Sequence, residues 1–378
     1  MLDQRRFANL PWGMVALIFA IALIGLATVY SATYTSKGPS TLYYRQLVWL
    51  AIGVIVMLLA LVVDYHTVGR YAYVLYAVSL LLLILVMAIG RTGMGAQRWL
   101  AIGPFAFQPS ELAKLSVTLA LARYFAEDPK RGGYDLRDLA IPGVMVLIPL
   151  LLVLKQPDLG TSLIYPLIFF SMATVLRTRA RSVLLAVLGI AVALPIAWSF
   201  LHEYQKERVV TFFSALVSSE KLDVQDAAWQ TTQSKIAVGS GHIFGKGFLH
   251  GTQNQLGFVP FQHTDFPFAV WSEEHGFVGV SLLMALYMFV VLWALRIASR
   301  ARDRFGALVA IGVAAMLFWH VAINMGMVLG LLPVVGVTLP LFSYGGSSVL
   351  ANLIGVGLLL SISARRQGSP WEGLGGRG

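Results

Sequence analysis

Long apolar runs constrain this chain more than any other feature, because about 20 such residues cross a bilayer as one helix. Hydrophobic residues make up 57% of the 378 residues and charged residues 12%, with a mean hydropathy of +0.74. A soluble domain carries about 25% charged residues. The runs predict an all-α polytopic membrane protein with about ten spans, near residues 12–31, 46–63, 71–90, 109–126, 138–154, 159–176, 182–200, 274–295, 306–330 and 344–364.

The basic residues of the loops predict the orientation of the spans, since Lys and Arg accumulate on the cytoplasmic side. The ends of the predicted spans on one side of the membrane are rich in arginine, including Arg123 and Arg296. The short loops on the other side carry few basic residues, such as Lys155. We therefore expect both termini in the cytoplasm and a large extracytoplasmic loop, 201–273, between the seventh and eighth spans. The net charge of +10 then reflects topology, and no nucleic-acid partner is expected.

The chain is predicted to form one membrane domain, 1–366, followed by a Gly-rich, disordered cytoplasmic tail, 367–378. The first span is expected to be an uncleaved anchor, because it is longer than the apolar core of a usual signal peptide. Within the large loop, 201–220 predicts an amphipathic interfacial helix. A second helix is expected over 223–239, with Trp229, Ile236 and Val238 on its buried side. Cysteine is absent, which excludes disulfides and a thiolate nucleophile.

Asp265 is the leading candidate for a functional acid, since it lies where the large loop enters the eighth span. Charge beside lipid is costly and tends to be functional. Pro267 follows at the second position, so Asp265 could instead be a helix N-cap. The crowding of His263, Glu273 and Glu274 around it favours a functional site, because a cap needs only one such residue.

Glu111 and Lys114 form a second candidate on the fourth span, where a spacing of three puts them on one face. Lys114 is expected about 13 Å from the inner end of the helix, a depth that requires a partner or a water-filled cavity. The pair is either a structural ion pair or the charged wall of a polar cavity.

Several other residues permit both a structural and a ligand-binding interpretation. Asp158 either caps the sixth span or lines a site. Arg98 and Arg45 are either interfacial anchors or phosphate ligands, a role that suits the guanidinium group. The small residues of 343–348 allow either close helix packing or close approach of a ligand. No P-loop, dinucleotide motif or zinc-ligand spacing is present.

Five segments occur in an order that resembles the SEDS family (shape, elongation, division and sporulation) over roughly 12–366. They are Gly95–Trp99, Gln108–Glu111, Gln156–Thr161, His263–Phe266 with Glu273 and Glu274, and Phe342–Ser347. Two segments, Tyr44–Gln46 and Phe342–Ser348, look more like the elongation member than the division member.

The resemblance implies a peptidoglycan glycosyltransferase of the bacterial inner membrane that polymerises lipid II with a class B penicillin-binding protein and the elongation machinery. The family's essential acid falls on Asp265, and its intramembrane acid–base pair falls on Glu111 and Lys114. The matching segments add further candidate substrate-binding residues, which are Thr161, His263, Thr264, Ser343 and Ser347.

The mechanism expected from this resemblance uses one carboxylate, because the diphosphate of lipid II is a good leaving group. Asp265 would accept the proton of the acceptor 4-hydroxyl, and attack opposite the diphosphate would invert the anomeric centre. Arg45, Arg98 and Lys114 would neutralise the diphosphate, directly or through a divalent cation (Mg or Mn). No dedicated metal site is expected. The rival interpretations are a lipid flippase or transporter and a non-catalytic scaffold.

Overall fold

The structure is a computed structural model of the whole chain. It describes residues 10–34, 38, 40–93, 96–103, 105–128, 133–176, 178–179, isolated positions between 181 and 199, 203–217 and 226–365. The predicted tail 367–378 and most of the predicted seventh span, 182–200, lie outside these residues.

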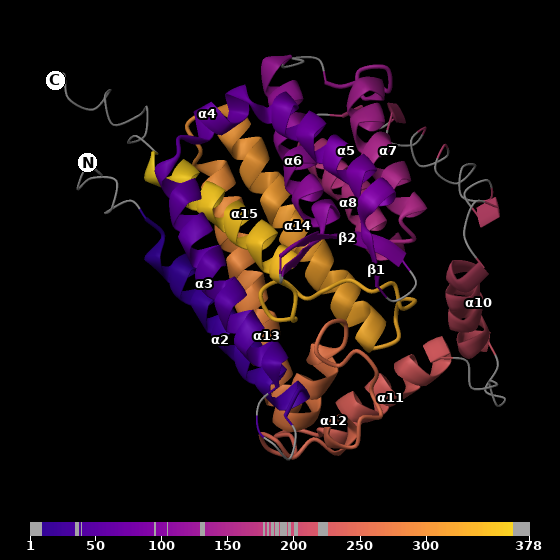
Figure 1. Cartoon of the computed structure of the whole chain (residues 1–378). Helices are drawn as coiled ribbons and strands as arrows, with labels where there is room; N and C mark the ends of the chain where they lie inside the picture. The colour runs from indigo at the N-terminus through magenta and orange to yellow at the C-terminus, as the bar shows by residue number, and fades with distance from the viewer. Residues whose placement is uncertain are drawn as a thin grey trace.

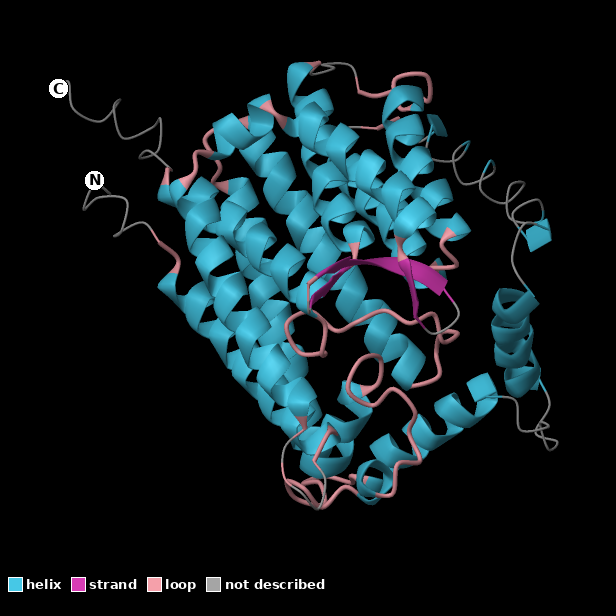
Figure 2. Ribbon diagram, in the orientation of Figure 1, coloured by secondary structure: helices cyan, strands magenta, loops and turns pink. Residues whose placement is uncertain are grey.

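The described chain is mostly helical, with a helix at each predicted span that falls within the described residues (Figures 1 and 2). Among the residues that the structure describes, six helices are long and apolar enough to cross a membrane: α2 (Trp12–Ala32), α3 (Thr41–Val62), α5 (Ala72–Ile89), α13 (Pro267–Ser299), α14 (Arg304–Val328) and α15 (Gly346–Ala364). The helices α7 (Ala140–Lys155) and α8 (Leu159–Val175) are apolar but shorter. The chain is therefore a polytopic membrane protein, as the sequence predicts.

The fourth predicted span, α6 (Pro109–Glu127), is buried inside the bundle and does not face lipid. Its sequence is less apolar than that of its neighbours, and α5, α8, α14 and α15 surround it. Gly312 of α14 makes this packing possible, because a Cβ there would lie 2.3 Å from Cγ2 of Thr118. The bundle thus keeps its most polar helix, with Glu111 and Lys114, away from the bilayer.

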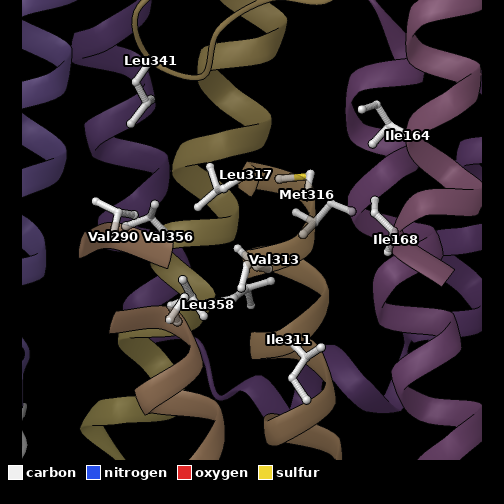
Figure 3. Packing of buried hydrophobic residues seen from close by; sticks show 14 of the residues in the cluster. Ile164, Ile168, Val290, Ile311, Val313, Met316, Leu317, Leu341, Val356 and Leu358 are labelled. Atoms are coloured by element: carbon white, nitrogen blue, oxygen red, sulfur yellow. The ribbon is translucent and has the colours of Figure 1, made fainter. Parts of the chain in front are cut away.

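Interlocking aliphatic side chains of α8, α13, α14 and α15 form the middle of the core. Figure 3 shows Ile168 of α8 near Met316 of α14, and Val313 of α14 near Leu358 of α15. These four side chains are almost fully buried. Since lipid tails are as apolar as these residues, such close packing rather than water exclusion holds membrane helices together.

A three-stranded antiparallel sheet, absent from the sequence prediction, connects α5 to α6. Its strands β1 (Arg91–Gly93), β2 (Ala96–Ile102) and β3 (Phe105–Phe107) pair in the order β1-β2-β3. Leu100 lies opposite Phe107 and Arg91 opposite Trp99. The sheet lies across the bundle below α5, α6 and α8 in the view of Figure 2, and it carries Arg98 toward the start of α8.

The large loop forms two helices close to the predicted ones, α10 (Glu203–Val217) and α11 (Asp226–Ser240), and a short one, α12 (Thr252–Gln255). The predicted buried face of α11 is wrong for Trp229 and Ile236, which are exposed. Its polar face is buried instead, and Ser234 donates a hydrogen bond to the carbonyl of Val328 in α14 (2.8 Å). Because α14 offers unpaired carbonyls near its end, the polar face is the better match.

The helix α13 is broken at Gly276, where φ is 62° and ψ is −160°. The amides of Phe277 and Val278 donate to the carbonyls of His242 and Ile243 (2.9 and 3.1 Å) instead of to their own helix. A left-handed backbone of this kind favours glycine. The kink separates a buried first part of α13, which follows Asp265, from the apolar remainder.

Two shorter segments complete the described fold. The helix α4 (Tyr65–Arg70) connects α3 to α5, and the N-cap Asp64 accepts a hydrogen bond from the amide of His66 (2.9 Å). A single parallel bridge joins Tyr134 to Thr178.

Candidate active site

A cavity of about 410 Å³ lies where four helices begin. The helices α6, α8 and α15 start directly after the cavity-lining residues Gln108, Asp158 and Gly345, and α13 starts two residues after Asp265. Helix N-termini carry a partial positive charge and favour anions. The remaining wall comes from β2, the loop before α13 and the loop 334–338, together with Arg208 of α10, Gln230 of α11 and His320 of α14.

Asp265 lines this cavity and does not cap α13. The N-cap residue is Phe266, and no side chain caps the helix. The backbone of Asp265 is fixed on both sides, because its amide donates to the carbonyl of Phe261 (3.0 Å) and its carbonyl accepts from Nδ2 of Asn324 (2.9 Å). A Cβ on Gly336 would lie 3.4 Å from Oδ2 of Asp265. The structure therefore excludes the N-cap interpretation.

The surroundings of Asp265 hold its pKa within the neutral range. Burial of the carboxyl group raises its pKa from 3.8 to about 6, and the positive charge of Arg208 opposes that rise. A carboxyl group with a pKa near 6 is mostly ionised at neutral pH and still basic enough to accept a proton efficiently. These are the properties of a general base.

Arg208 is a cavity residue that the sequence analysis did not select. It comes from α10, which stands at the right edge of the molecule in Figure 1, and its Nη1 donates to the carbonyl of Val334 (3.1 Å). The surrounding sequence indicates only an amphipathic helix. The position of Arg208 in the cavity depends on tertiary contact with the 334–338 loop, which no local sequence pattern encodes.

His263 and Thr264, which precede Asp265, have different environments. Thr264 lines the cavity. His263 does not, and its ring packs edge-on against Tyr344 with 5.9 Å between ring centroids. The carbonyl of His263 accepts from the amide of Tyr344 (2.8 Å), which joins the loop before α13 to the start of α15. Burial lowers the pKa of His263 below its usual 6.5.

Glu111 and Lys114 form a buried ion pair, and Lys114 also hydrogen-bonds His320 of α14. The Nζ atom of Lys114 lies 2.9 Å from Oε1 of Glu111 and 2.7 Å from Nε2 of His320. Because Nδ1 of His320 contacts the carbonyl of Thr338 (3.1 Å), we assign the proton of the neutral ring to Nδ1, which leaves Nε2 to accept from Lys114.

The Glu111–Lys114 pair fits both interpretations that the sequence left open, a structural ion pair and the charged wall of a polar cavity. Glu111 and His320 reach the cavity wall, whereas Lys114 lies behind them. Oε2 of Glu111 is buried without a hydrogen-bond partner. The pair is therefore a structural junction between α6 and α14, and its acid faces the cavity.

Asp158 likewise caps a helix and lines the cavity. Its carboxylate accepts from the amide and hydroxyl of Thr161 (3.1 and 3.0 Å) in the first turn of α8. It also accepts from Nε2 of Gln108 (2.9 Å) at the start of α6. Asp158 thus aligns two helix N-termini, and Thr161 and Gln108 line the cavity with it.

Arg98 holds the turn before α8 and also lines the cavity. Its Nε donates to the carbonyl of Gln156 (2.9 Å), its Nη2 donates to the carbonyl of Pro157, and its Nη1 lies 3.9 Å from Asp158. Part of its donor capacity is therefore used within the protein. The guanidinium still presents a fixed positive charge to the cavity.

Of the remaining candidate residues, one lines the cavity, one forms a hydrogen bond outside the lining, and one is exposed at the surface. Ser347 lines the cavity and accepts from the amide of Gln108 (2.8 Å). Ser343 does not line it, and its Oγ accepts from the amide of Leu339 (2.8 Å). Arg45 is exposed on α3 outside the lining. Its neighbour Gln46 is buried instead, and its Nε2 donates to the carbonyl of Ser343 (3.2 Å).

Glu273 and Glu274 lie apart from the cavity, so the expected convergence of acids around Asp265 does not extend to them. Oε1 of Glu273 accepts from Nζ of Lys246 (2.6 Å) and from the amide of Gln253 (3.0 Å). Glu274 accepts from the hydroxyl of Ser31 and from the amide of Leu249 (3.2 Å). Both acids fasten the large loop to the membrane helices.

Taken together, the fold and cavity define a class of protein: a multi-pass membrane protein with an acid-and-arginine cavity where several helices begin. A family model described as cell cycle protein, covering FtsW, RodA and SpoVE, matches residues 9–368. The chain therefore belongs to this family, which confirms the resemblance to the SEDS proteins.

Two curated relatives illustrate the similarity. Peptidoglycan glycosyltransferase MrdB of Escherichia coli (strain K12) is 39% identical over 355 residues, covering 94% of this chain and 93% of the relative. Peptidoglycan glycosyltransferase RodA of Treponema pallidum (strain Nichols) is 33% identical over 431 residues, covering 96% and 99%.

Two solved structures share the fold. One comes from work on the structural coordination of polymerization and crosslinking by a peptidoglycan synthase complex, with a TM-score of 0.79, 35% identity and coverage of 95% of this chain and 99% of that one. The other is the Rod shape determining protein RodA of Thermus thermophilus, with a TM-score of 0.70, 33% identity and coverage of 95% and 98%.

Proposed function

We propose that this protein is a peptidoglycan glycosyltransferase that polymerises lipid II into glycan strands during cell elongation. The observation that carries the proposal is the carboxylate of Asp265, fixed by its backbone in a cavity that holds its pKa at about 6. The names of the similar MrdB and RodA proteins support the reaction class and the elongation role.

Asp265 acts as the general base in this proposal. It accepts the proton of the acceptor sugar hydroxyl while that oxygen forms a bond to the anomeric carbon of the donor. The bond from the anomeric carbon to the diphosphate oxygen breaks with its electron pair, and the polyprenyl diphosphate leaves. Because attack comes from the face opposite the leaving group, the anomeric configuration inverts. General-base catalysis of this kind contributes about 10²–10⁴-fold.

The diphosphate binds on the side of the cavity that carries the positive charges. Arg98 and Arg208 both line the cavity, and guanidinium groups match phosphate oxygens with two donors at once. The N-termini of α6, α8 and α15 add partial positive charge. Arg45 lies outside the lining, and Lys114 contributes through Glu111 and His320.

A divalent cation could accompany the diphosphate, although the donor set does not form a dedicated site. In the described part of the chain, no three metal-ligating side chains come together. A Mg²⁺ ion would therefore be held chiefly by the diphosphate and water, with at most one or two protein carboxylates, as is common for this ion.

The protein lies in the bacterial inner membrane with both termini in the cytoplasm in this proposal, since the arginine-rich ends define the cytoplasmic side. The cavity then opens on the extracytoplasmic side, where the substrate sugars are. The partner is a class B penicillin-binding protein, which supplies crosslinking, and the similar structure from a peptidoglycan synthase complex supports such an assembly.

The test is polymerisation of labelled lipid II by the purified protein with its cognate class B penicillin-binding protein. Asp265→Asn should abolish glycan chains, whereas Asp135→Asn, an exposed acid paired with Arg179, should not. Chains from the Asp265→Asn protein would refute the general-base assignment. A wild type that makes no chains but moves lipid II between leaflets would instead establish the flippase.

A further inference from the structure

A second cavity, of about 230 Å³, lies at the C-terminal end of α13. The cavity that contains Asp265 lies before the N-terminal end of the same helix. The second cavity is lined by Pro11, Trp293, Arg296, Ile297, Arg300, Ile362 and Ser363. These residues come from the entry into α2, the last turns of α13 and the end of α15. The start of α2 and the end of α15 lie on the same side of the bundle, at the left of Figure 1.

We propose that this cavity binds the phosphate headgroup of an anionic membrane phospholipid. Arg296 and Arg300 are four residues apart and share one face at the C-terminal end of α13. Among the described residues, no acidic side chain lines the cavity. Neither guanidinium forms an ion pair with another side chain in the part of the chain that the structure describes.

The chemistry of the wall fits a lipid rather than a soluble anion. Ile297 and Ile362 are buried apolar residues beside the two arginines, and they suit the first carbons of an acyl chain. Tryptophan is typical of the depth at which headgroups meet acyl chains. The volume is smaller than the ~300–1,000 Å³ of ordinary small-molecule sites, which suits a headgroup whose tails remain in the bilayer.

Trp293 is held rigidly, which gives the cavity a fixed wall. Gly13 of α2 packs directly on the indole, because a Cβ there would lie 2.3 Å from its Cη2 atom. Ile297 lies one turn further along α13 and is fixed by the same helix pairing. A preformed wall lowers the ordering cost of binding.

A simpler interpretation is that the two arginines only complement the helix dipole and the positive-inside rule. That interpretation explains charge at the end of α13. It does not explain why the charge borders a hollow with a fixed indole and two aliphatic side chains. Basic pockets between membrane helices on the cytoplasmic side are known to bind anionic headgroups.

The experiment measures anionic lipid retained by the purified full-length protein. Protein in detergent is mixed with phosphatidylglycerol, with phosphatidylcholine or with inorganic phosphate, and bound lipid and the thermal midpoint are recorded. Phosphatidylglycerol should bind and raise the midpoint, whereas the other two should not. Equal protection by inorganic phosphate would overturn the lipid assignment, and so would equal binding of phosphatidylcholine.

Variants then locate the site. Arg296→Gln with Arg300→Gln should weaken phosphatidylglycerol binding about 25-fold, since each basic residue near an anionic surface contributes roughly a factor of five. The double lysine variant should retain part of the binding, which shows that charge rather than fold is responsible. Arg302→Gln is the matched control, because this exposed arginine follows α13 but lies outside the lining. Unchanged binding in the double glutamine variant would refute the proposed site.

Discussion

The pH dependence of polymerisation tests the central role of Asp265 most directly. With a pKa of about 6, about 97% of the carboxyl groups are ionised at pH 7.5 and about 9% at pH 5. Because the general base must be ionised to accept a proton, the rate should fall roughly tenfold between these pH values. An aspartate at 3.8 would remain about 94% ionised at pH 5 and would give almost no decline.

The assay is the initial rate of glycan-strand formation from labelled lipid II between pH 4.5 and 8.5. His263 is the main confounding group, since it lies nearby and its pKa is also displaced, in its case downward. The acid limb should therefore persist in His263→Gln. Any residual rate of Asp265→Asn should be about 10²–10⁴-fold lower and should lack this limb. A wild-type rate that stays constant down to pH 5 would refute the assignment.

Three further predictions follow from the same geometry. Asp265→Asn should raise the thermal midpoint at pH 7.5, because the pKa of Asp265 is about 6 in the folded protein and 3.8 in the unfolded chain. Protonation of Asp265 therefore stabilises the wild type below pH 4, and about 3 kcal/mol of this stability is lost as the pH rises through 6. An unchanged midpoint would contradict this reasoning. Arg208→Ala should move the acid limb of the rate profile up by about one pH unit, whereas Arg208→Lys should leave it in place. Lys114→Ala should destabilise the protein by about 3–5 kcal/mol, because the buried carboxylate of Glu111 loses its partner. The double variant Glu111→Gln/Lys114→Met should recover most of this loss. Normal thermal stability of Lys114→Ala with lost turnover would indicate a substrate role.

The membrane helices could be predicted from the sequence because an apolar run of fixed length is a physical requirement of the bilayer. The sheet β1–β3 could not, since its strands of three to seven residues are too short to show a period. The buried face of α11 was assigned wrongly because Trp229 and Ile236 are apolar. Its polar face instead meets polar groups of the bundle, including the carbonyl of Val328.

Residues of the site could be predicted only where the neighbouring sequence alone sets them apart. Asp158, Glu111 and Asp265 each stand at or near the start of a helix, and their polarity there is conspicuous beside apolar runs. Arg208 and His320 reach the cavity from α10 and α14, and their partners are distant in the chain. Sequence alone also placed Arg45 in the site, although it lies outside the lining.

The acids in and near the cavity differ in how they are held, and this difference singles out the base. The carboxylates of Asp158 and Glu273 accept hydrogen bonds from distant segments of the chain, and that of Glu111 accepts one from Lys114 one turn further along the same helix. Asp265 is held instead by its own amide and carbonyl. A carboxylate that is already engaged in strong hydrogen bonds is a weaker base. Fixing Asp265 through its backbone keeps its position defined, while the side chain of Thr264 hydrogen-bonds its carboxylate and leaves acceptor capacity for the substrate hydroxyl.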